Sequence, residues 1–383
     1  MENLVNKSER YVTVADQDPR LASLLDGVVS DPELRPILMA SLNPVNARNE
    51  WTFEMVPLAT LERPSLARVW LSALRPDSWV LSLGPMIASL GFTAAWMRVN
   101  EQVFQPLLAV LTVVGIMALH ASINLFGDYQ DHKRGWDRVR QRAGARVIAR
   151  GWLRARDVHR AAWGMLGLAA LAGAGILLDR MSSFEAWNGL YTVLILLPIV
   201  FAALAFAVAR FGFKYRGFAE IAAWFMFGPL LTGGFFWAMT GAPSWKSLVF
   251  GSVFGSLALL SLHLKNFERI LVDGQAGIKT WPVRAGFDAS KTFTYFCLGL
   301  LSFSMATAVV LADPVAERLI PALVLAFGIG PLAARVRRLE SPLAGKMRDL
   351  HRTGLRLAWM NLLAFSLGDI LRLYGDALVG FVP

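Results

Sequence analysis

From residue 77 onward, long apolar segments alternate with short stretches that carry most of the charged residues. About 20 apolar residues are enough for an α-helix to cross a bilayer. The pattern predicts a membrane span in each of the following segments: 78–96, 106–126, 162–178, 190–209, 219–240, 247–264, 293–312, 319–334 and 357–380. The expected fold class is therefore all-α, a multi-pass membrane bundle of about nine transmembrane helices.

Residues 1–72 differ from the rest and are interpreted as a cytosolic N-terminal extension of unknown role, followed by a membrane domain over 73–383. Up to residue 75 the chain has 8 Lys and Arg, 10 Asp and Glu, 6 prolines and no apolar run that could span a bilayer. Its first residues lack the basic and apolar regions of a secretory signal. Short stretches such as 21–29 could form amphipathic helices, and the simplest expectation is an arm that packs on the membrane domain.

Composition supports a membrane protein and excludes other classes. Of 383 residues, 55% are hydrophobic and only 17% are charged, below the roughly 25% charged residues of soluble domains. Mean hydropathy is +0.46. Abundant apolar residues exclude intrinsic disorder, and a single cysteine, Cys297, excludes a disulfide scaffold. The net charge of +10 leaves nucleic acid, an anionic membrane surface or an anionic substrate as partners.

The distribution of basic residues predicts the topology. The connections after the second, fourth, sixth and eighth spans contain 10, 3, 5 and 7 Lys and Arg, and the other four connections contain one each. Positively charged loops stay on the cytoplasmic side of a membrane. We therefore expect a plasma (inner) membrane protein with its N-terminus and its basic loops in the cytoplasm, and no role in nucleic-acid binding.

A polar cluster continues the second span at its cytoplasmic end. Asn124, Asp128 and Asp131 fall within about 60° of one another on a helix. Two carboxylates and an amide oxygen that converge in this way favour a hard divalent cation such as Mg²⁺. The alternative is a solvated helix end that happens to be acidic. Basic residues follow directly, and a site for a metal–diphosphate complex needs both kinds of charge: Lys133, Arg134, Arg138, Arg140, Arg142, Arg146 and Arg150.

A second cluster follows the sixth span. Asn266, Arg269 and Asp273 share one face if the helix continues, whereas Glu268 lies about 140° from Asp273. Glycines then permit a turn that would bring Lys279 back over the site.

These clusters resemble the UbiA superfamily of intramembrane aromatic prenyltransferases, and most closely the 1,4-dihydroxy-2-naphthoate branch of menaquinone synthesis. The family's first motif, N-x-x-x-D-x-x-D, is complete at Asn124–Asp131. Further similarity lies in Arg75-Pro76, Gly135, Asp137, residues 144–151, residues 214–220 and residues 227–234, and the resemblance covers residues 73 to about 295.

One position departs from that branch. The family's second motif typically has an Asp four residues before its last Asp, and this chain has Arg269 there with an acid one step earlier at Glu268. Either the helix is locally overwound so that Glu268 reaches the metal, or Arg269 contacts the diphosphate directly. Helix geometry favours the second interpretation. The substitution also leaves open another acceptor or an inactive protein.

The resemblance implies Mg²⁺-dependent transfer of a polyprenyl group from an allylic polyprenyl diphosphate to an aromatic acceptor, within a lipid bilayer and without a protein partner. The diphosphate leaves, and the allylic cation is attacked by an aromatic carbon, with loss of the ring carboxyl in the naphthoate branch. The implied catalytic residues are Asp128, Asp131 and Asp273. The implied metal ligands are Asn124, Asp128, Asp131, Asn266 and Asp273. The implied diphosphate-binding residues are Lys133, Arg134, Arg146, Lys214, Arg216, Arg269 and Lys279.

Other interpretations remain open from the sequence. The acceptor could be 4-hydroxybenzoate or homogentisate, or the chain could be a non-catalytic lipid- or quinone-binding membrane protein on the same scaffold. His120, one turn before Asn124, is either a proton acceptor or a hydrogen-bonded packing residue. The best candidates to line a cavity are Phe227, Phe235, Phe236 and Trp237.

Overall fold

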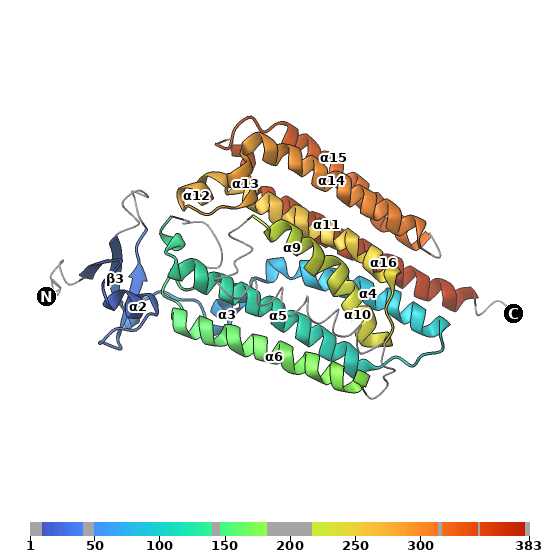
Figure 1. Ribbon diagram of the computed structural model, residues 1–383, viewed down its shortest axis with the longest axis horizontal. Helices are drawn as coiled ribbons and strands as arrows, with labels where there is room; N and C mark the ends of the chain where they lie inside the picture. The colour runs from blue at the N-terminus through green and yellow to red at the C-terminus, as the bar shows by residue number, and fades with distance from the viewer. Residues whose placement is uncertain are drawn as a thin grey trace.

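The chain has two parts, a small N-terminal unit with a β-sheet and a long helical bundle. The N-terminal unit lies at one end of the bundle (Figure 1). The computed structural model describes residues 10–40, 50–139, 146–181, 217–312, 316–343 and 345–379.

The N-terminal unit is a three-stranded antiparallel sheet with one helix packed against it. Strands β1 (Tyr11–Ala15), β2 (Leu34–Leu38) and β3 (Glu50–Pro57) lie in the order β1-β3-β2, and helix α2 (Arg20–Leu25) contacts β1 and β2. Its core consists of Val14, Leu24, Leu25, Leu38, Trp51 and Phe53.

Helix α2 overlaps the stretch 21–29, where an amphipathic helix was considered, whereas the sheet was not predicted. Its signal was the alternation of apolar and polar residues along β3, where Trp51 and Phe53 are buried between partly exposed neighbours. The all-α expectation therefore holds for the bundle and not for residues 11–57.

A linker leads from the sheet into the bundle. It contains the 3₁₀ turn η2 (Leu58–Thr60), helix α3 (Leu66–Leu74) and the 3₁₀ turn η3 (Pro76–Ser78). The buried face of α3 packs in a cluster with Leu125 of the bundle and with Val147 of the following loop. This packing fixes where the first membrane helix begins.

Eight helical stretches in the described part of the chain are long and apolar enough to cross a membrane. They are α4 (Val80–Val99), α5 (Pro106–Lys133), α6 (Ala155–Met181), the stretch α9 (Ala219–Phe225), η5 (Met226–Leu230) and α10 (Leu231–Thr240), α11 (Trp245–Glu268), α14 (Phe287–Val310), α15 (Ala316–Arg337) and α16 (Leu350–Val379). Short elements at the polar end are η4 (Trp136–Arg138), α12 (Ile270–Gln275), α13 (Trp281–Ala285) and η6 (Gly345–Met347). These stretches confirm eight of the nine predicted spans. The remaining one, the fourth along the chain at 190–209, falls outside the described residues.

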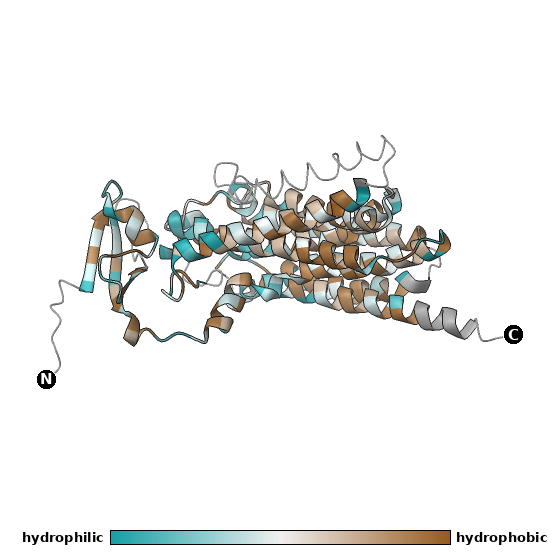
Figure 2. Cartoon of the chain, turned by 90° about the horizontal axis from the view of Figure 1, so that it is seen from below, coloured by the Kyte–Doolittle hydropathy of each residue, from teal (hydrophilic) through white to brown (hydrophobic). Residues whose placement is uncertain are grey.

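Helix α11 is the central helix of the bundle. In its most apolar segment 78% of the residues are buried, compared with 11% in α6. Helix α11 packs against α4, α9, η5, α10, α14 and α16. Hydrophobic residues fill the middle of the bundle, and hydrophilic residues gather at the end near the N-terminal unit (Figure 2).

The helical stretch from α9 to α10 is interrupted by a π-helical turn, η5. Gly228 within it has non-helical dihedrals (φ −114°, ψ −107°) and is followed by Pro229, which has no N–H to donate. A Cβ on Gly228 would lie 2.6 Å from the Cα of Gly255, so only glycine permits this approach to α11. Such π-turns are frequent at functional sites.

Candidate functional site

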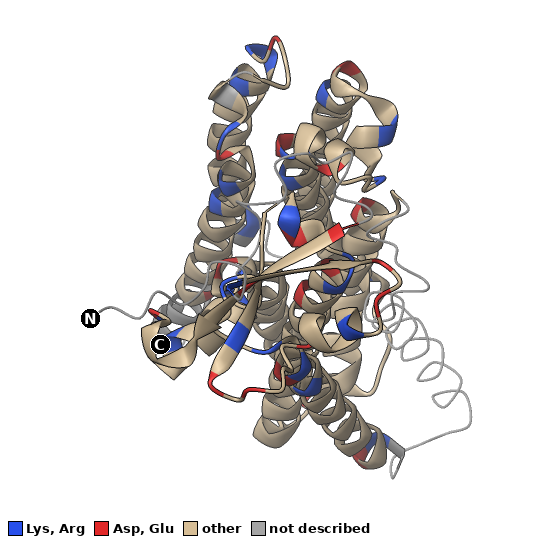
Figure 3. Ribbon diagram, turned by 90° about the vertical axis from the view of Figure 1, so that its left-hand side faces the viewer, with Lys and Arg blue, Asp and Glu red and all other residues tan. Residues whose placement is uncertain are grey.

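The first polar cluster lies on α5, as expected. The helix continues unbroken through Lys133, so Asn124, Asp128 and Asp131 occupy its last turns on the face that the spacing predicts. Asp128 and Asp131 are both buried. These acids lie at the polar end of the bundle, where basic and acidic residues are interspersed over the helix ends (Figure 3).

Arg75 pairs with the first of these acids. Its Nη2 donates to Asp128 Oδ1, and Arg75 itself joins α3 to η3 in a left-handed conformation (φ 54°). The other oxygen, Asp128 Oδ2, is buried and accepts no hydrogen bond within the described residues. The Nδ2 of Asn124 donates to the carbonyl of Leu74 at 3.1 Å, which anchors the same linker. Sequence reasoning noted the Arg-Pro pair but did not assign Arg75 to the site.

The second polar cluster is divided by a break in the helix. Helix α11 ends at Glu268 and α12 begins at Ile270, because Arg269 has non-helical dihedrals (φ −100°, ψ 9°). The shared face of Asn266, Arg269 and Asp273 was conditional on a continuous helix, and this condition is not met, so an angle counted across Arg269 does not give the direction of its side chain. Asp273 is fully buried. Gly277 provides the predicted turn (φ 72°), after which Lys279 is exposed.

Glu268 connects the end of α11 to the start of α16 through hydrogen bonds. Its Oε1 accepts from the backbone N–H of Asp349 at 3.1 Å, and its Oε2 accepts from the backbone N–H of His351 at 3.0 Å and lies 2.6 Å from His351 Nδ1. It thus satisfies backbone donors at the start of α16, in the manner of a helix cap. These contacts favour a structural role for Glu268 over the alternative in which an overwound helix turns it toward a metal.

Glu220 is a buried acid at the start of α9 that sequence reasoning did not assign to the site. Its Oε1 accepts from Asn266 Nδ2 at 2.7 Å, while its Oε2 is buried and accepts no hydrogen bond within the described residues. Because the amide nitrogen of Asn266 faces this carboxylate, its Oδ1 points elsewhere and can serve as a ligand. The signal was Glu220 itself, an acid at the edge of a predicted span.

The predicted diphosphate-binding residues have different surroundings. Lys133 Nζ donates to Asp26 Oδ1 at 2.8 Å, in the N-terminal unit. The Arg134 guanidinium lies 5.1 Å from the centre of the Trp136 ring. Burial lowers the pKa of the half-buried Arg146, which still stays charged at neutral pH. Lys214 and Arg216 lie outside the described residues.

The N-terminal unit docks on the loop that follows the first cluster. His132 Nε2 lies 3.1 Å from the carbonyl of Leu25, and Arg138 Nη1 donates to the carbonyl of Glu50 at 2.7 Å. Gly135 (φ 69°) fits against Trp51, since a Cβ there would lie 2.5 Å from that ring. The expected packing of the extension on the membrane domain is therefore found at the candidate site.

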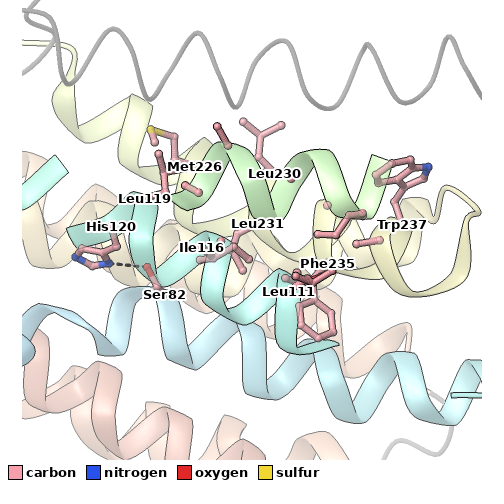
Figure 4. Close-up of a pocket in the computed structure, with 18 of the residues that line it drawn as sticks. Ser82, Leu111, Ile116, Leu119, His120, Met226, Leu230, Leu231, Phe235 and Trp237 are labelled. Carbon is pink, nitrogen blue, oxygen red and sulfur yellow. Dashed lines mark hydrogen bonds between the residues drawn. The ribbon is translucent and has the colours of Figure 1, made fainter. Parts of the chain in front are cut away.

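An apolar cavity of about 540 Å³ lies along α5 between Leu111 and Ile123, and Ile123 directly precedes Asn124 of the first cluster. Its lining comes from α4, α5, α6 and the stretch from η5 to α10 (Figure 4). Of the predicted aromatic residues, Phe227, Phe235 and Trp237 line it. Phe236 does not, because it packs against Phe92 and Trp96 at centroid distances of 5.6 and 5.2 Å.

The donor set suits a divalent cation that also takes ligands from a substrate. Within the residues that the structure describes, no three His, Cys, Asp or Glu side chains form a metal-binding group. The buried Asp128 Oδ2 nevertheless accepts no hydrogen bond there. Mg²⁺ typically takes one or two carboxylates together with phosphate and water oxygens, and the buried Asp128 carboxylate can supply one of them.

Residues 81–355 match the sequence model of the UbiA prenyltransferase family, which is more than half of the chain. The chain belongs to the UbiA prenyltransferase family. This membership makes it a multi-pass membrane protein of a family of prenyltransferase enzymes, and it confirms the resemblance that the two motifs carry.

Relatives of this UbiA chain include 1,4-dihydroxy-2-naphthoate octaprenyltransferases. The Haemophilus influenzae enzyme is 29% identical over 257 residues, which cover 63% of this chain and 79% of the relative. The Mycobacterium tuberculosis enzyme is 28% identical over 245 residues, which cover 64% and 79%. A UbiA homologue from Archaeoglobus fulgidus, solved with GPP and Mg²⁺, superposes with a TM-score of 0.55 at 14% identity and covers 78% of this chain and 99% of its own. That structure supports the fold.

Proposed function

We propose that this UbiA protein transfers a polyprenyl group from an allylic polyprenyl diphosphate to an aromatic acceptor, with 1,4-dihydroxy-2-naphthoate as the favoured acceptor. The observation that carries the proposal is the order of features along α5, which lines the apolar cavity as far as Ile123 and carries the buried acids Asp128 and Asp131 on its following turns. An allylic diphosphate needs both environments, one for its charged head and one for its tail.

The cavity suits the isoprenoid tail. His120 at one end and Leu111 towards the other are nine residues apart on α5, or roughly 13 Å along the helix. Most side chains between them are apolar, so the tail would gain free energy on leaving water. The bilayer and the helices that line the cavity would keep water away from an allylic cation formed at the polar end of the cavity.

The head would lie at the two polar clusters. The residues that would hold Mg²⁺ are Asn124, Asp128, Asp131, Asn266 and Asp273. When bound, Mg²⁺ would neutralise charge that develops on the leaving diphosphate. The basic residues proposed to take the remaining phosphate oxygens are Lys133, Arg134, Arg146, Lys214, Arg216, Arg269 and Lys279.

Arg75 has a supporting role in this arrangement. Its ion pair with Asp128 Oδ1 orients the carboxylate, so that the buried Oδ2 is the oxygen left for a ligand. Glu220 acts similarly on the second cluster, because it holds the amide nitrogen of Asn266 and so directs the amide oxygen away. We therefore assign Arg75 and Glu220 to positioning of the ligands.

In the proposed orientation the protein lies in the plasma (inner) membrane, with the polar end of the bundle on the cytoplasmic side. The connections rich in Lys and Arg, which include Lys133 and Arg269, are the ones that the distribution of charge predicts on the cytoplasmic side, where a water-soluble acceptor would enter. The relatives that act on 1,4-dihydroxy-2-naphthoate favour this acceptor over 4-hydroxybenzoate or homogentisate.

The test is transfer by the purified chain in lipid nanodiscs, with a radiolabelled polyprenyl diphosphate, Mg²⁺ and each of the three acceptors in turn. The proposal predicts a prenylated, decarboxylated product from 1,4-dihydroxy-2-naphthoate and no product in EDTA. Transfer only to one of the other two acceptors would contradict 1,4-dihydroxy-2-naphthoate as the acceptor. No transfer to any of the three would contradict the proposed prenyltransferase activity.

A further inference from the structure

A histidine and two serines form a hydrogen-bonded chain at the polar end of the cavity. His120 Nδ1 lies 2.6 Å from Ser82 Oγ, and His120 Nε2 lies 3.2 Å from Ser78 Oγ. Figure 4 shows the imidazole and Ser82 at one end of the cavity, with aliphatic and aromatic side chains beyond them. Both residues are buried, with 5% and 1% of their surfaces exposed.

The direction of each hydrogen bond follows from the available protons. The hydroxyl of Ser78 donates its one proton to the carbonyl of Arg75 at 2.9 Å, so its oxygen must accept from His120 Nε2. A histidine in an apolar cavity, bonded to two hydroxyls, takes the neutral form with one N–H. His120 Nδ1 is then an acceptor, and Ser82 donates to it.

This arrangement leaves Ser82 Oγ as a hydrogen-bond acceptor toward the cavity that it lines. A ligand there must bring an O–H or N–H donor. The isoprenoid tail has no such group, and a diphosphate bound to cations offers only acceptors. Of the two substrates of a prenyltransferase, only an aromatic acceptor with ring hydroxyls can complete the chain.

The position agrees with the place where the two substrates would meet. His120 lies four residues, or roughly 6 Å, deeper in the bundle than Asn124 on the same helix. Asn124 Nδ2 also lies 3.4 Å from Ser78 Oγ, so the hydrogen-bonded chain touches the first cluster. An allylic carbon between the diphosphate head and the tail would lie at this level.

We propose that Ser82 is the binding residue for a ring hydroxyl of the aromatic acceptor and that His120 is its positioning residue. Ser82 Oγ accepts a hydrogen bond from the hydroxyl, and His120 Nδ1 holds the Ser82 proton so that the oxygen faces the ligand. Polarisation of the ring O–H bond increases electron density at the ring carbon that attacks. The proposal rests on the proposed function, because it requires a hydroxylated aromatic acceptor.

The test compares binding of 1,4-dihydroxy-2-naphthoate and 4-hydroxybenzoate with binding of their methyl ethers, which have no hydroxyl donor on the ring. The full chain is used in nanodiscs, with Mg²⁺ and an unreactive thiolo analogue of geranyl diphosphate. Wild-type protein should prefer the hydroxylated ligand of at least one pair, and Ser82→Ala should reduce that preference about tenfold, the usual effect of one lost hydrogen bond. Ser122→Ala is the matched control, because the buried Ser122 hydroxyl donates to the carbonyl of Ala162 in α6 and Ser122 does not line the cavity.

Two variants separate positioning by His120 from simple packing. Glutamine has one acceptor oxygen and one donor nitrogen, which can replace the acceptor and donor nitrogens of the neutral imidazole, whereas leucine only fills space. His120→Gln should keep most of the preference for the hydroxyl, and His120→Leu should lose about as much as Ser82→Ala. Equal losses from the two variants would overturn the positioning role.

The outcomes distinguish this proposal from the proposed function. A preference that Ser82→Ala leaves unchanged, or a wild type without any preference, overturns the acceptor site. If wild type shows the preference and Ser82→Ala loses it, but the same preparation transfers no prenyl group from geranyl diphosphate, then the acceptor site stands and the proposed activity fails.

Discussion

The guanidinium of Arg138 lies over the ring of Trp51, 3.8 Å from its centre. Arg138 belongs to η4, five residues beyond the end of helix α5, and Trp51 belongs to strand β3 in the N-terminal unit. A cation over an indole ring in a buried position contributes on the order of 1–2 kcal/mol. The contact therefore ties the N-terminal unit to the loop after the first cluster, where the diphosphate would bind.

Trp51→Ala should release this loop. The change removes the ring under Arg138 and a large core residue of the N-terminal unit, at a cost of roughly 3–5 kcal/mol. Hydrogen exchange should rise in residues 134–139 and 146–154 while α11 stays protected. Trp51→Phe keeps an aromatic ring and should show a much smaller increase. Unchanged exchange in Trp51→Ala would contradict the docking.

Glu268 should matter for stability rather than for metal binding. Glu268→Gln weakens the bonds to the backbone N–H groups of Asp349 and His351, so the free energy of unfolding should fall by about 1–3 kcal/mol. Thermal unfolding in detergent measures the loss. Glu340→Gln, at an exposed glutamate, is the matched control. A stable Glu268→Gln protein with weakened Mg²⁺ dependence would return Glu268 to the metal site.

The far end of the cavity should limit the length of the isoprenoid. Leu111→Trp adds bulk to the lining at a distance from His120, so the KM for a long prenyl diphosphate should rise at least several-fold, while that for geranyl diphosphate changes little. Leu107→Trp is the matched control, since Leu107 is one turn earlier on α5 and 70% exposed. Equal effects on both donors would show that the tail lies elsewhere.

Much of the fold and half of the site could be predicted because they depend on local sequence. Membrane spans follow from runs of apolar residues, and the geometry of Asn124, Asp128 and Asp131 follows from one unbroken helix. The break at Arg269 could not be predicted by counting along a regular helix. The roles of Glu268 and Arg75 depend on partners 81 and 53 residues away along the chain, which no local pattern contains.

The sheet at residues 11–57 was missed for a different reason. Its strands are short and separated by proline-containing segments, so their alternation was weak beside the strong signal of the membrane spans. Trp51 and Phe53 showed the period of two, but only pairing with β1 and β2 makes β3 a strand.

The central claim is that Asp128, with its buried Oδ2, holds the metal–diphosphate head. Asp128→Asn tests it most directly, because the amide oxygen can still accept from Arg75 while the negative charge is lost. The measurement is calorimetric titration of a thiolo polyprenyl diphosphate into the nanodisc-bound chain, with Mg²⁺ and with EDTA. We predict that Mg²⁺ strengthens binding to wild type at least tenfold and that Asp128→Asn removes this gain at an unchanged Tm. Equal gains from Mg²⁺ in both proteins would contradict the account.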